Sequence, residues 1–331
     1  MAKETTEKFK TMIGGQALIE GIMMRGPKED AVVVRGKDGL QVEVKPRKIY
    51  PEKSPLRWPF IRGVVNFFDA QVTGVKALMQ SADLSPEETE EQPSKLDMWL
   101  EKKLGDKKFQ SFVLSSAVAL GLCMSVALFF LLPMIVSSLL AGLIQNNLLL
   151  NLVEGLVRIV IFISYMLIVS RMKEMKRVFA YHGAEHKTIR CYEAGLELTV
   201  ENVRGQTRLH PRCGTSFLFI VMILSILVFS VASSLLLSVT PELAQMRESA
   251  RLLYSLIMIG FKLLLLPVLV SIAYEINRLV GRYDNWFTRI LTWPGMWFQN
   301  FTTNEPDDSM IEVGITAVKA VMPKEAGADR W

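Results

Sequence analysis

Long apolar runs without charged residues are the main feature of this chain. No Asp, Glu, Lys or Arg occurs between residues 109 and 153. A single helix of that length would measure about 65 Å, roughly twice the hydrocarbon thickness of a bilayer. The run therefore holds one membrane crossing and the start of a second, and two more apolar runs follow it. The pattern predicts four membrane-spanning helices, over residues 111–139, 148–170, 215–240 and 252–274.

The first hundred residues carry shorter patterns that are typical of a small mixed domain. Residues 31–35 and 40–45 alternate apolar and polar side chains on either side of Gly36-Lys37-Asp38-Gly39, which predicts a β-hairpin. Residues 60–81 place apolar side chains, including Phe68, at helical spacing. We expect this amphipathic helix to pack on the small sheet. The alternative is that it lies on the membrane surface.

Basic residues are unevenly distributed among the segments that join the predicted crossings. Residues 171–212 contain nine Lys and Arg, whereas residues 241–250 contain only Arg247. Because loops rich in Lys and Arg stay in the cytoplasm, this asymmetry predicts that the middle loop and both termini are cytoplasmic. The formal charge of +5 then follows from membrane orientation. The lipid bilayer is the expected partner, and no nucleic-acid partner is needed.

These patterns predict an α-helical polytopic membrane protein, with about four transmembrane helices and a small N-terminal α+β cytoplasmic domain. Half of the residues are hydrophobic and 21% are charged, which is at the apolar limit for a soluble protein. Three cysteines are too few for a disulfide framework. The expected parts are the cytoplasmic domain with its amphipathic helix (1–82), an acidic linker and basic juxtamembrane segment (83–108), a four-helix membrane domain with a cytoplasmic His/Cys loop at 171–214 (109–280), and an interfacial aromatic segment with a C-terminal cytoplasmic helix (281–331).

All three histidines of the chain lie in the basic middle loop. On a helix, His182 and His186 stand one turn apart, so both rings can bind one metal ion, and Glu185 lies near the same face. This H-x-x-E-H order is that of inverted zincins, in which the two histidines bind zinc and the glutamate activates water. His210 and Cys213 come directly before the third crossing and can supply a further ligand. We therefore expect a divalent metal, zinc, held by His182, His186, His210 and Cys213, with Glu185 as the catalytic base.

Alternatives to this metal site remain open. The histidines can instead form a hydrogen-bonded cluster without metal, and Glu193 and Glu275 are acidic candidates for further ligands. Lys262 lies near the middle of the fourth crossing, where an unpaired charge is costly. We expect it to bind Glu154 or backbone carbonyls, and the functional alternative is a polar route for a small solute.

Four segments of the chain resemble the bacterial YqhQ-type membrane proteins, a family of unknown function described as predicted metal-dependent enzymes. The resemblance covers nearly the whole chain and implies a multi-pass location in the bacterial cytoplasmic membrane. It also implies metal dependence, but it brings no substrate. The segments are Gly14-Gly15-Gln16-Ala17-Leu18-Ile19-Glu20-Gly21-Ile22-Met23-Met24-Arg25, Tyr181-His182-Gly183-Ala184-Glu185-His186-Lys187, His210-Pro211-Arg212-Cys213-Gly214 and Thr302-Thr303-Asn304-Glu305-Pro306-Asp307-Asp308.

Two functional hypotheses follow from the membrane location and the histidine cluster. The first is a membrane-embedded metal-dependent enzyme, a hydrolase that acts at the cytoplasmic membrane face on a lipid or a membrane-protein segment. The second is a non-enzymatic accessory factor for membrane-protein insertion or assembly, associated with the translocon or other membrane proteins. In the second case the His/Cys cluster is structural. An open coordination position favours the enzyme, and a closed four-ligand site favours the structural role.

Overall fold

The computed structural model describes residues 8–51, 53–85, 106–140, 143–144, 147–325 and 327–330. The chain divides into two compact units, which we call the sheet unit and the bundle unit. The sheet unit comprises Met1–Pro86, Tyr165–Ser225 and Leu265–Trp331, and the bundle unit comprises Glu87–Ser164 and Ile226–Leu264. The sheet unit thus takes in the expected N-terminal domain, His/Cys loop and C-terminal segment together. Most of the expected acidic linker lies outside the described residues.

The sheet unit contains one antiparallel sheet in the order β1-β2-β3-β4. Its strands are β1 (Gly14–Leu18), β2 (Gly21–Arg25), β3 (Glu29–Gly36) and β4 (Gly39–Pro46). Gly36 pairs with Gly39 across the last turn, and Gly39 has a φ of 110°, which a residue without Cβ adopts readily. The predicted hairpin is therefore confirmed.

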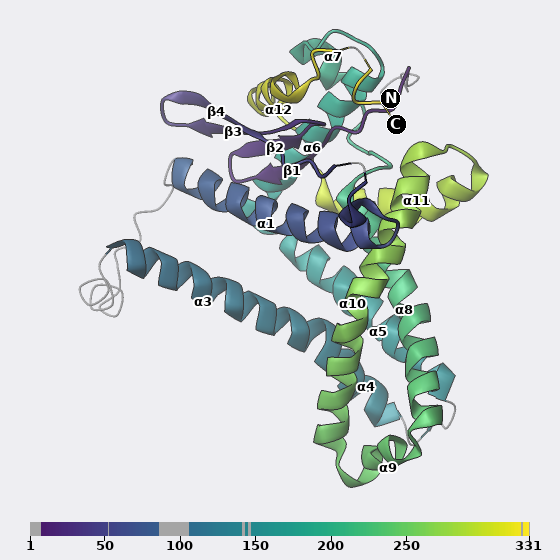
Figure 1. The fold of residues 1–331 in the computed structure, drawn as a ribbon. Coiled ribbons are helices and arrows are strands. Elements are labelled where there is room, and N and C mark those ends of the chain that lie inside the picture. Colours follow the sequence, from purple (N-terminus) through teal and green to yellow (C-terminus); the bar gives the residue numbers. More distant parts are fainter. Residues whose placement is uncertain are drawn as a thin grey trace. The chain divides into compact units, whose positions relative to one another are not determined.

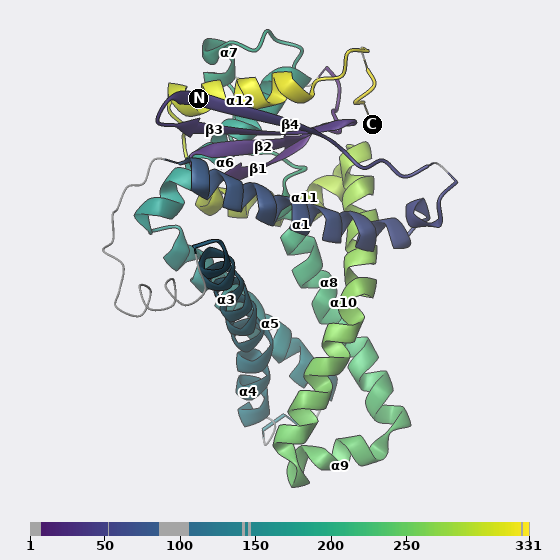
Figure 2. The ribbon, with the colours of Figure 1, turned by 60° about the vertical axis from the view of Figure 1, so that its left-hand side comes forward.

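Both faces of this sheet are covered by helices (Figures 1 and 2). Ile22, Met24 and Val33 pack with α6 (Lys173–Glu193) and α12 (Asp308–Val321). The intervening residues, including Met23 and Val32, point the other way and pack with Ala77 of α1 (Ile61–Leu84). This alternation is the two-residue period of a strand, and it gives a three-layer arrangement with the sheet in the middle.

Helix α1 covers the sheet, as expected, but it does so with its small residues. Gly63, Gly74, Ala77 and Ser81 are its buried positions, whereas Phe68 is exposed. A side chain at Gly74 would collide with Gln16 of β1, so the close approach of helix and sheet needs a residue without Cβ. The expectation that the large apolar residues face the sheet was wrong, because the helix and sheet lie too close together to accommodate them.

Four helices are long and apolar enough to cross a membrane, which confirms the predicted number. The candidate spans are Ala119–Ser137, Leu149–Val169, Gly214–Val239 and Leu252–Arg282. The last continues beyond the predicted end at residue 274. The helices that carry or join these spans are α3 (Asp106–Val126), the π-helical segment η2 (Ala127–Leu131), α4 (Leu132–Leu139), α5 (Asn147–Val169), α8 (Gly214–Val239), α9 (Pro241–Ser249) and α10 (Arg251–Arg282).

The bundle unit buries a cluster of three charged residues. The Glu154 carboxylate accepts from both Lys262 and Arg158, the latter at 2.9 Å. Arg158 Nε also donates to the Phe129 carbonyl at 2.8 Å. This carbonyl lies four residues before Pro133, which has no N–H to donate to it. The expectation that Lys262 has a protein partner is confirmed.

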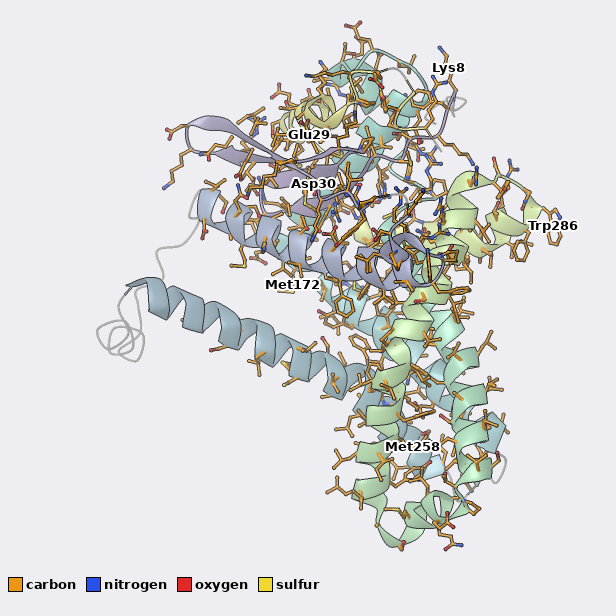
Figure 3. The ribbon with its side chains drawn as sticks, in the orientation of Figure 1. Lys8, Glu29, Asp30, Met172, Met258 and Trp286 are labelled. Carbon is orange, nitrogen blue, oxygen red and sulfur yellow. The ribbon has the colours of Figure 1, made fainter. Side chains whose placement is uncertain are left out.

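The remaining helices of the sheet unit are short or lie near the C-terminus: η1 (Pro55–Arg57), α7 (Val200–Arg204) and α11 (Trp286–Thr302). Asn285 and Thr288 form a capping box at the start of α11, whose first residue, Trp286, points outward (Figure 3). Asp307 caps the start of α12, because its carboxylate accepts from the Met310 N–H at 3.0 Å.

Both ends of the chain are tied to the middle segment within the sheet unit. The Lys8 N–H donates to the Glu193 carbonyl at 2.8 Å, and the Met12 N–H donates to the Asp329 carbonyl at 2.6 Å. The Thr11 N–H donates to the Glu193 carboxylate at 2.8 Å. Residues 8–12, α6 and Asp329 therefore meet beside one buried glutamate.

Candidate metal centre

Two histidines and one cysteine from separate elements converge in the sheet unit. His182 and His186 stand one turn apart on α6, and Cys213 immediately precedes α8. One ligand atom from each of the three lies within 4.8 Å of the other two. His182 Nε2 is 3.1 Å from Cys213 Sγ, and the two imidazole centroids are 4.4 Å apart. The predicted convergence of the helical pair with Cys213 is present.

Backbone carbonyls orient both imidazole rings of this group. His182 Nδ1 lies 2.8 Å from the Thr302 carbonyl, and His186 Nδ1 lies 2.6 Å from the Arg208 carbonyl. A carbonyl only accepts, so each Nδ1 carries the proton and each Nε2 presents a lone pair. Such a contact at the second ring nitrogen is characteristic of metal-binding histidines. Thr302 and Arg208 were not singled out from the sequence, because main-chain contacts leave no residue signature.

His186 Nε2 is the strongest sign that this group holds an ion. It is buried and has no hydrogen-bond partner among the described residues. Burial, helped by the nearby His182 and His210 and opposed by Cys213, lowers the pKa of His186 to about 4, so its ring is neutral at physiological pH. A buried lone pair without a donor is costly unless something binds it, and a metal ion at this point would satisfy it.

The surroundings of Cys213 favour its thiolate, which is the form of cysteine that metals bind. Burial by itself raises its pKa, but the nearby His186 and hydrogen bonds from Thr215 outweigh burial, so the pKa is lowered. The Thr215 N–H and hydroxyl lie 3.4 and 3.3 Å from Sγ. Thiolate is the ligand form of cysteine, and a depressed pKa favours it.

Glu185 lies on the same turn of α6 and is 5% exposed. Burial raises its pKa to about 7, while the charges of His182 and Cys213 act on it in opposite directions. The Gly15 N–H of β1 donates to its carboxylate, and a Cβ at Gly15 would lie 2.9 Å from Glu185 Cδ. Gly15 therefore lets the strand approach the carboxyl. A carboxyl with a pKa near 7 can both accept and donate a proton near neutral pH.

His210 does not join this group, contrary to the expectation that it is a ligand. Its ring centroid lies 5.6 Å from that of His186, and its Nε2 lies 3.3 Å from Glu193, which also binds Arg212. Gln299 fixes the backbone of His210 through two hydrogen bonds of 2.8 Å, and this directs the side chain toward Glu193. Burial, together with the nearby arginines, holds the pKa of His210 well below its usual value.

The other candidate ligands from the sequence also lie elsewhere. Glu193 belongs to the His210–Arg212 network, and Glu275 binds Arg62. The Cys191 thiol donates to the Glu197 carbonyl at 3.6 Å. The donor set of the centre is therefore two histidines and one cysteine.

The segment Thr302–Asp308 closes over α6 beside the centre. A Cβ at Gly183 would collide with the Asn304 carbonyl, so glycine between the two histidines allows this segment to approach. The Asn304 N–H donates to the Phe179 carbonyl at 2.8 Å, and Glu305 binds Lys187 at 2.6 Å. These contacts bring the segments at 181–187 and 302–308 together in the structure.

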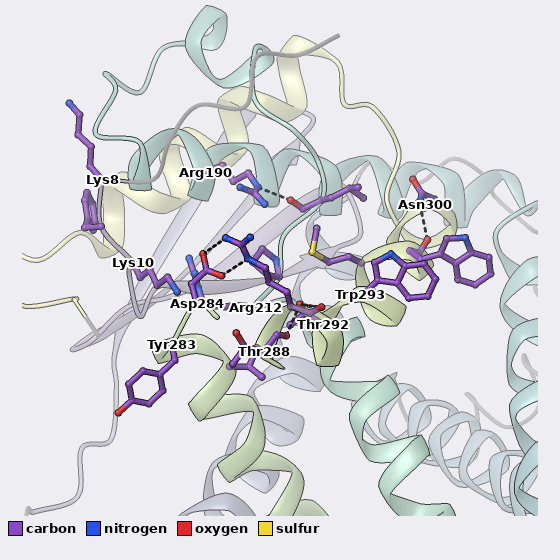
Figure 4. A pocket seen from close by; sticks show the side chains of 17 residues that line it. Lys8, Lys10, Arg190, Arg212, Tyr283, Asp284, Thr288, Thr292, Trp293 and Asn300 are labelled. Atoms are coloured by element: carbon purple, nitrogen blue, oxygen red, sulfur yellow. Dashed lines mark hydrogen bonds and ion pairs between the residues drawn. The ribbon is translucent and has the colours of Figure 1, made fainter. Parts of the chain in front are cut away.

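A cavity of about 970 Å³ lies beside the network of His210, Glu193 and Arg212 (Figure 4). Arg212 lines it, while the next residue, Cys213, belongs to the candidate metal centre. Its wall combines cationic side chains with the apolar side chains of Trp293, Met296 and Trp297. The cationic lining residues are Lys8, Lys10, Arg190, Arg212 and Arg289, and the one acidic lining residue, Asp284, pairs with Arg289. Such a lining suits an amphipathic molecule with a negative charge.

Comparison with known proteins defines the class to which this fold and centre belong. Residues 58–324 match the family described as "Protein of unknown function (DUF1385)", and the chain belongs to this family. It is 32% identical over 329 residues to the "Uncharacterized protein YqhQ" of Bacillus subtilis (strain 168), covering 96% of this chain and 95% of that protein. The resemblance seen in the sequence is thus confirmed. No solved structure matches.

Proposed function

We propose that the chain is a membrane-embedded metal-dependent hydrolase acting at the cytoplasmic face of the bacterial membrane. The observation that carries this proposal is the convergence of His182, His186 and Cys213 around a buried, unpartnered His186 Nε2, with Glu185 on the same turn. Imidazole and thiolate donors suit zinc. Three protein ligands are the number typical of catalytic zinc sites.

The chain's own groups have the properties that hydrolysis needs. A bound zinc ion would polarise the scissile group and lower the pKa of water. The Thr302 and Arg208 carbonyls hold the two imidazoles in the ligating tautomer. Glu185, with its pKa of about 7, takes a proton from water and returns it to the leaving group. The Gly15 N–H keeps its carboxylate in place.

The proposed substrate is a lipid or a membrane-protein segment. The cavity beside Arg212 supports this proposal, because its indole and thioether side chains suit an acyl or apolar chain and its cations suit a phosphate or carboxylate. Residues 165–225, which carry the nine basic residues, fold together with both chain ends. From the positive-inside rule we infer that this unit lies on the cytoplasmic side.

Burial favours a second candidate function, that of an accessory factor with a structural metal centre. Glu185, His186 and Cys213 are only 5%, 1% and 8% exposed, which is typical of a closed site. In that case the centre stabilises the sheet unit, and the protein assists membrane-protein insertion or assembly through its surface.

Metal analysis of the full-length protein in detergent tests the centre. We expect close to one zinc per chain in the wild type and substantial loss in His182→Ala, His186→Ala and Cys213→Ser. Cys191→Ser is the matched control, because it removes a buried thiol outside the group and should keep its zinc. Wild-type protein without zinc, iron or manganese would refute the metal centre.

Glu185→Gln separates the enzyme from the structural factor. Membranes of cells lacking the chromosomal copy, complemented with either wild type or Glu185→Gln, are compared by lipid and membrane-peptide mass spectrometry. We expect the variant to keep its zinc but to accumulate an uncleaved lipid or peptide. If Glu185→Gln restores the wild-type profile in full, the hydrolase proposal fails and the structural role stands.

A further inference from the structure

A second cavity of the sheet unit, of about 740 Å³, is strongly basic. Seven of its fifteen lining residues are Arg or Lys and none is Asp or Glu. The cationic residues are Arg47, Lys48, Arg57, Arg62, Arg278, Arg282 and Arg330. They come from the β4–α1 connection, α1, the end of α10 and the C-terminal segment, so the fold gathers them from four parts of the chain.

The protein itself neutralises little of this charge. Arg62 binds Glu275, and it is the one of the seven with an ion pair among the described residues. Within the part of the chain that the structure describes, Arg47 and Arg57 donate to backbone carbonyls, of Gly26 at 3.2 Å and Tyr50 at 3.4 Å. Several guanidinium groups thus face a common space and have N–H groups available for a ligand. A guanidinium can donate two parallel hydrogen bonds to phosphate oxygens.

The cavity lies at the end of a helix that is long enough to cross the whole membrane. Helix α10 has 32 residues, which corresponds to about 48 Å. The hydrocarbon core is about 30 Å thick and the bilayer with its headgroups 40–45 Å. Tyr274, Arg278 and Arg282 are spaced four residues apart over its last turns, so they share one face. If the helix spans the bilayer from its first residues, we expect this face at headgroup depth. Asn66 of α1 joins them by donating to the Tyr274 hydroxyl at 2.9 Å.

Exposed apolar side chains lie close to these cations in the sequence. They support the expectation that the cavity lies at the depth of the lipid headgroups. Trp58, which follows the lining residue Arg57, is 58% exposed, and Phe60 and Ile49 are similarly exposed. Large apolar residues that flank arginines without being covered by protein are typical of a surface in contact with the membrane interface. The exposed apolar side of α1, including Phe68, continues this surface.

From these observations we propose that the cavity binds the phosphate of an anionic phospholipid headgroup. The arginines of α10 and of the β4–α1 connection hold the phosphate, and Tyr50 and Tyr274, which also line the cavity, supply hydroxyl groups for the remainder of the headgroup. The acyl chains extend along the apolar side of α1. This site is separate from the metal centre and does not depend on the proposed hydrolase activity.

Native mass spectrometry of the full-length protein in a neutral detergent tests this site with two lipids. Dioleoyl phosphatidylglycerol and dioleoyl phosphatidylcholine are titrated separately. We expect the wild type to bind phosphatidylglycerol about tenfold more tightly, and Arg278→Gln/Arg282→Gln to lose most of that preference. The control is Arg171→Gln/Lys173→Gln, which removes two exposed cations beside the end of α5. This control should keep the preference.

Two further measurements keep the test decisive. The Arg278→Gln/Arg282→Gln protein should keep the thermal midpoint and the size-exclusion elution volume of the wild type in detergent, which shows that it is folded. If it does not, the exposed single variant Arg57→Gln replaces it, with an expected loss of about threefold in phosphatidylglycerol affinity. Equal binding of the two lipids by the wild type, or an equal loss in the control, overturns the proposal. So does binding of inorganic pyrophosphate without retention of phosphatidylglycerol, because the site then serves a soluble anion.

Discussion

Gly183 stands between the two histidines of the metal centre, and replacing it with alanine tests how His182 is oriented. A Cβ essentially never lies within 3.0 Å of another heavy atom, and the Asn304 carbonyl is well inside that distance. The carbonyl would have to retreat by about 1 Å. Because Thr302 is only two residues away, its carbonyl would move as well, and the 2.8 Å contact with His182 Nδ1 would be lost.

Two effects of Gly183→Ala are expected, and they can be measured separately. Overpacking lowers the free energy of unfolding by about 1–3 kcal/mol, which is read as a fall in the thermal midpoint in detergent. Loss of the contact that orients a ligand weakens metal binding by about 10- to 100-fold, which is read by competition with a chromophoric chelator.

Gly205→Ala is the matched control for this prediction. Gly205 also lies in the sheet unit, but the nearest atoms to a Cβ there are 3.6 Å away, so neither quantity should change appreciably. If Gly183→Ala binds zinc as tightly as the wild type and unfolds at the same temperature, the Thr302 carbonyl does not orient His182. The contact between residues 181–187 and 302–308 would then not support the histidines.

Three further predictions concern buried charges and a helix cap. Glu154→Gln leaves Lys262 without its counter-charge and should destabilise the protein by about 3–5 kcal/mol; adding Lys262→Met should recover part of the loss, and fluorescence-detected size exclusion after heating measures both. Glu193→Gln should cost a similar amount, because Arg212 is only 10% exposed; a midpoint equal to that of the wild type would contradict this. Asp307→Ala removes the N-cap of α12 and should cost about 1 kcal/mol, seen as a small fall in the thermal midpoint, whereas Asp307→Asn should be nearly neutral.

The local parts of the fold could be predicted because each depends on a short pattern. The absence of charge located the four spans, and alternation around Gly36–Gly39 located the hairpin. Interactions across the chain were harder to anticipate. Hydrophobicity does not distinguish a side chain that faces a sheet from one that faces lipid, so Phe68 was assigned to the wrong side of α1. The buried side is defined by small residues such as Gly74, and only the distance between helix and sheet reveals why.

The metal centre shows the same division between local and distant information. Helical spacing was enough to pair His182 with His186, and closeness to the start of α8 made Cys213 a candidate. His210 was an equal candidate, because the direction of its side chain depends on Gln299, 89 residues further along the chain. The supporting carbonyl of Thr302 could not be identified either, since any residue type can supply a carbonyl.

Segments from three distant parts of the chain meet at Glu193 and Glu185 of α6. Their order in the sequence has a consequence for biogenesis. Gly15 supports Glu185 from the N-terminal end, α6 carries the ligands, and Thr302 completes them from beyond the last membrane span. Contacts between such distant segments form late in folding. The centre with its supporting carbonyl can therefore form only after all four candidate spans have been made. A chain that stalls or is cut before Thr302 keeps the three candidate ligands but lacks the carbonyl that orients His182, so we expect it to bind metal about 10- to 100-fold more weakly.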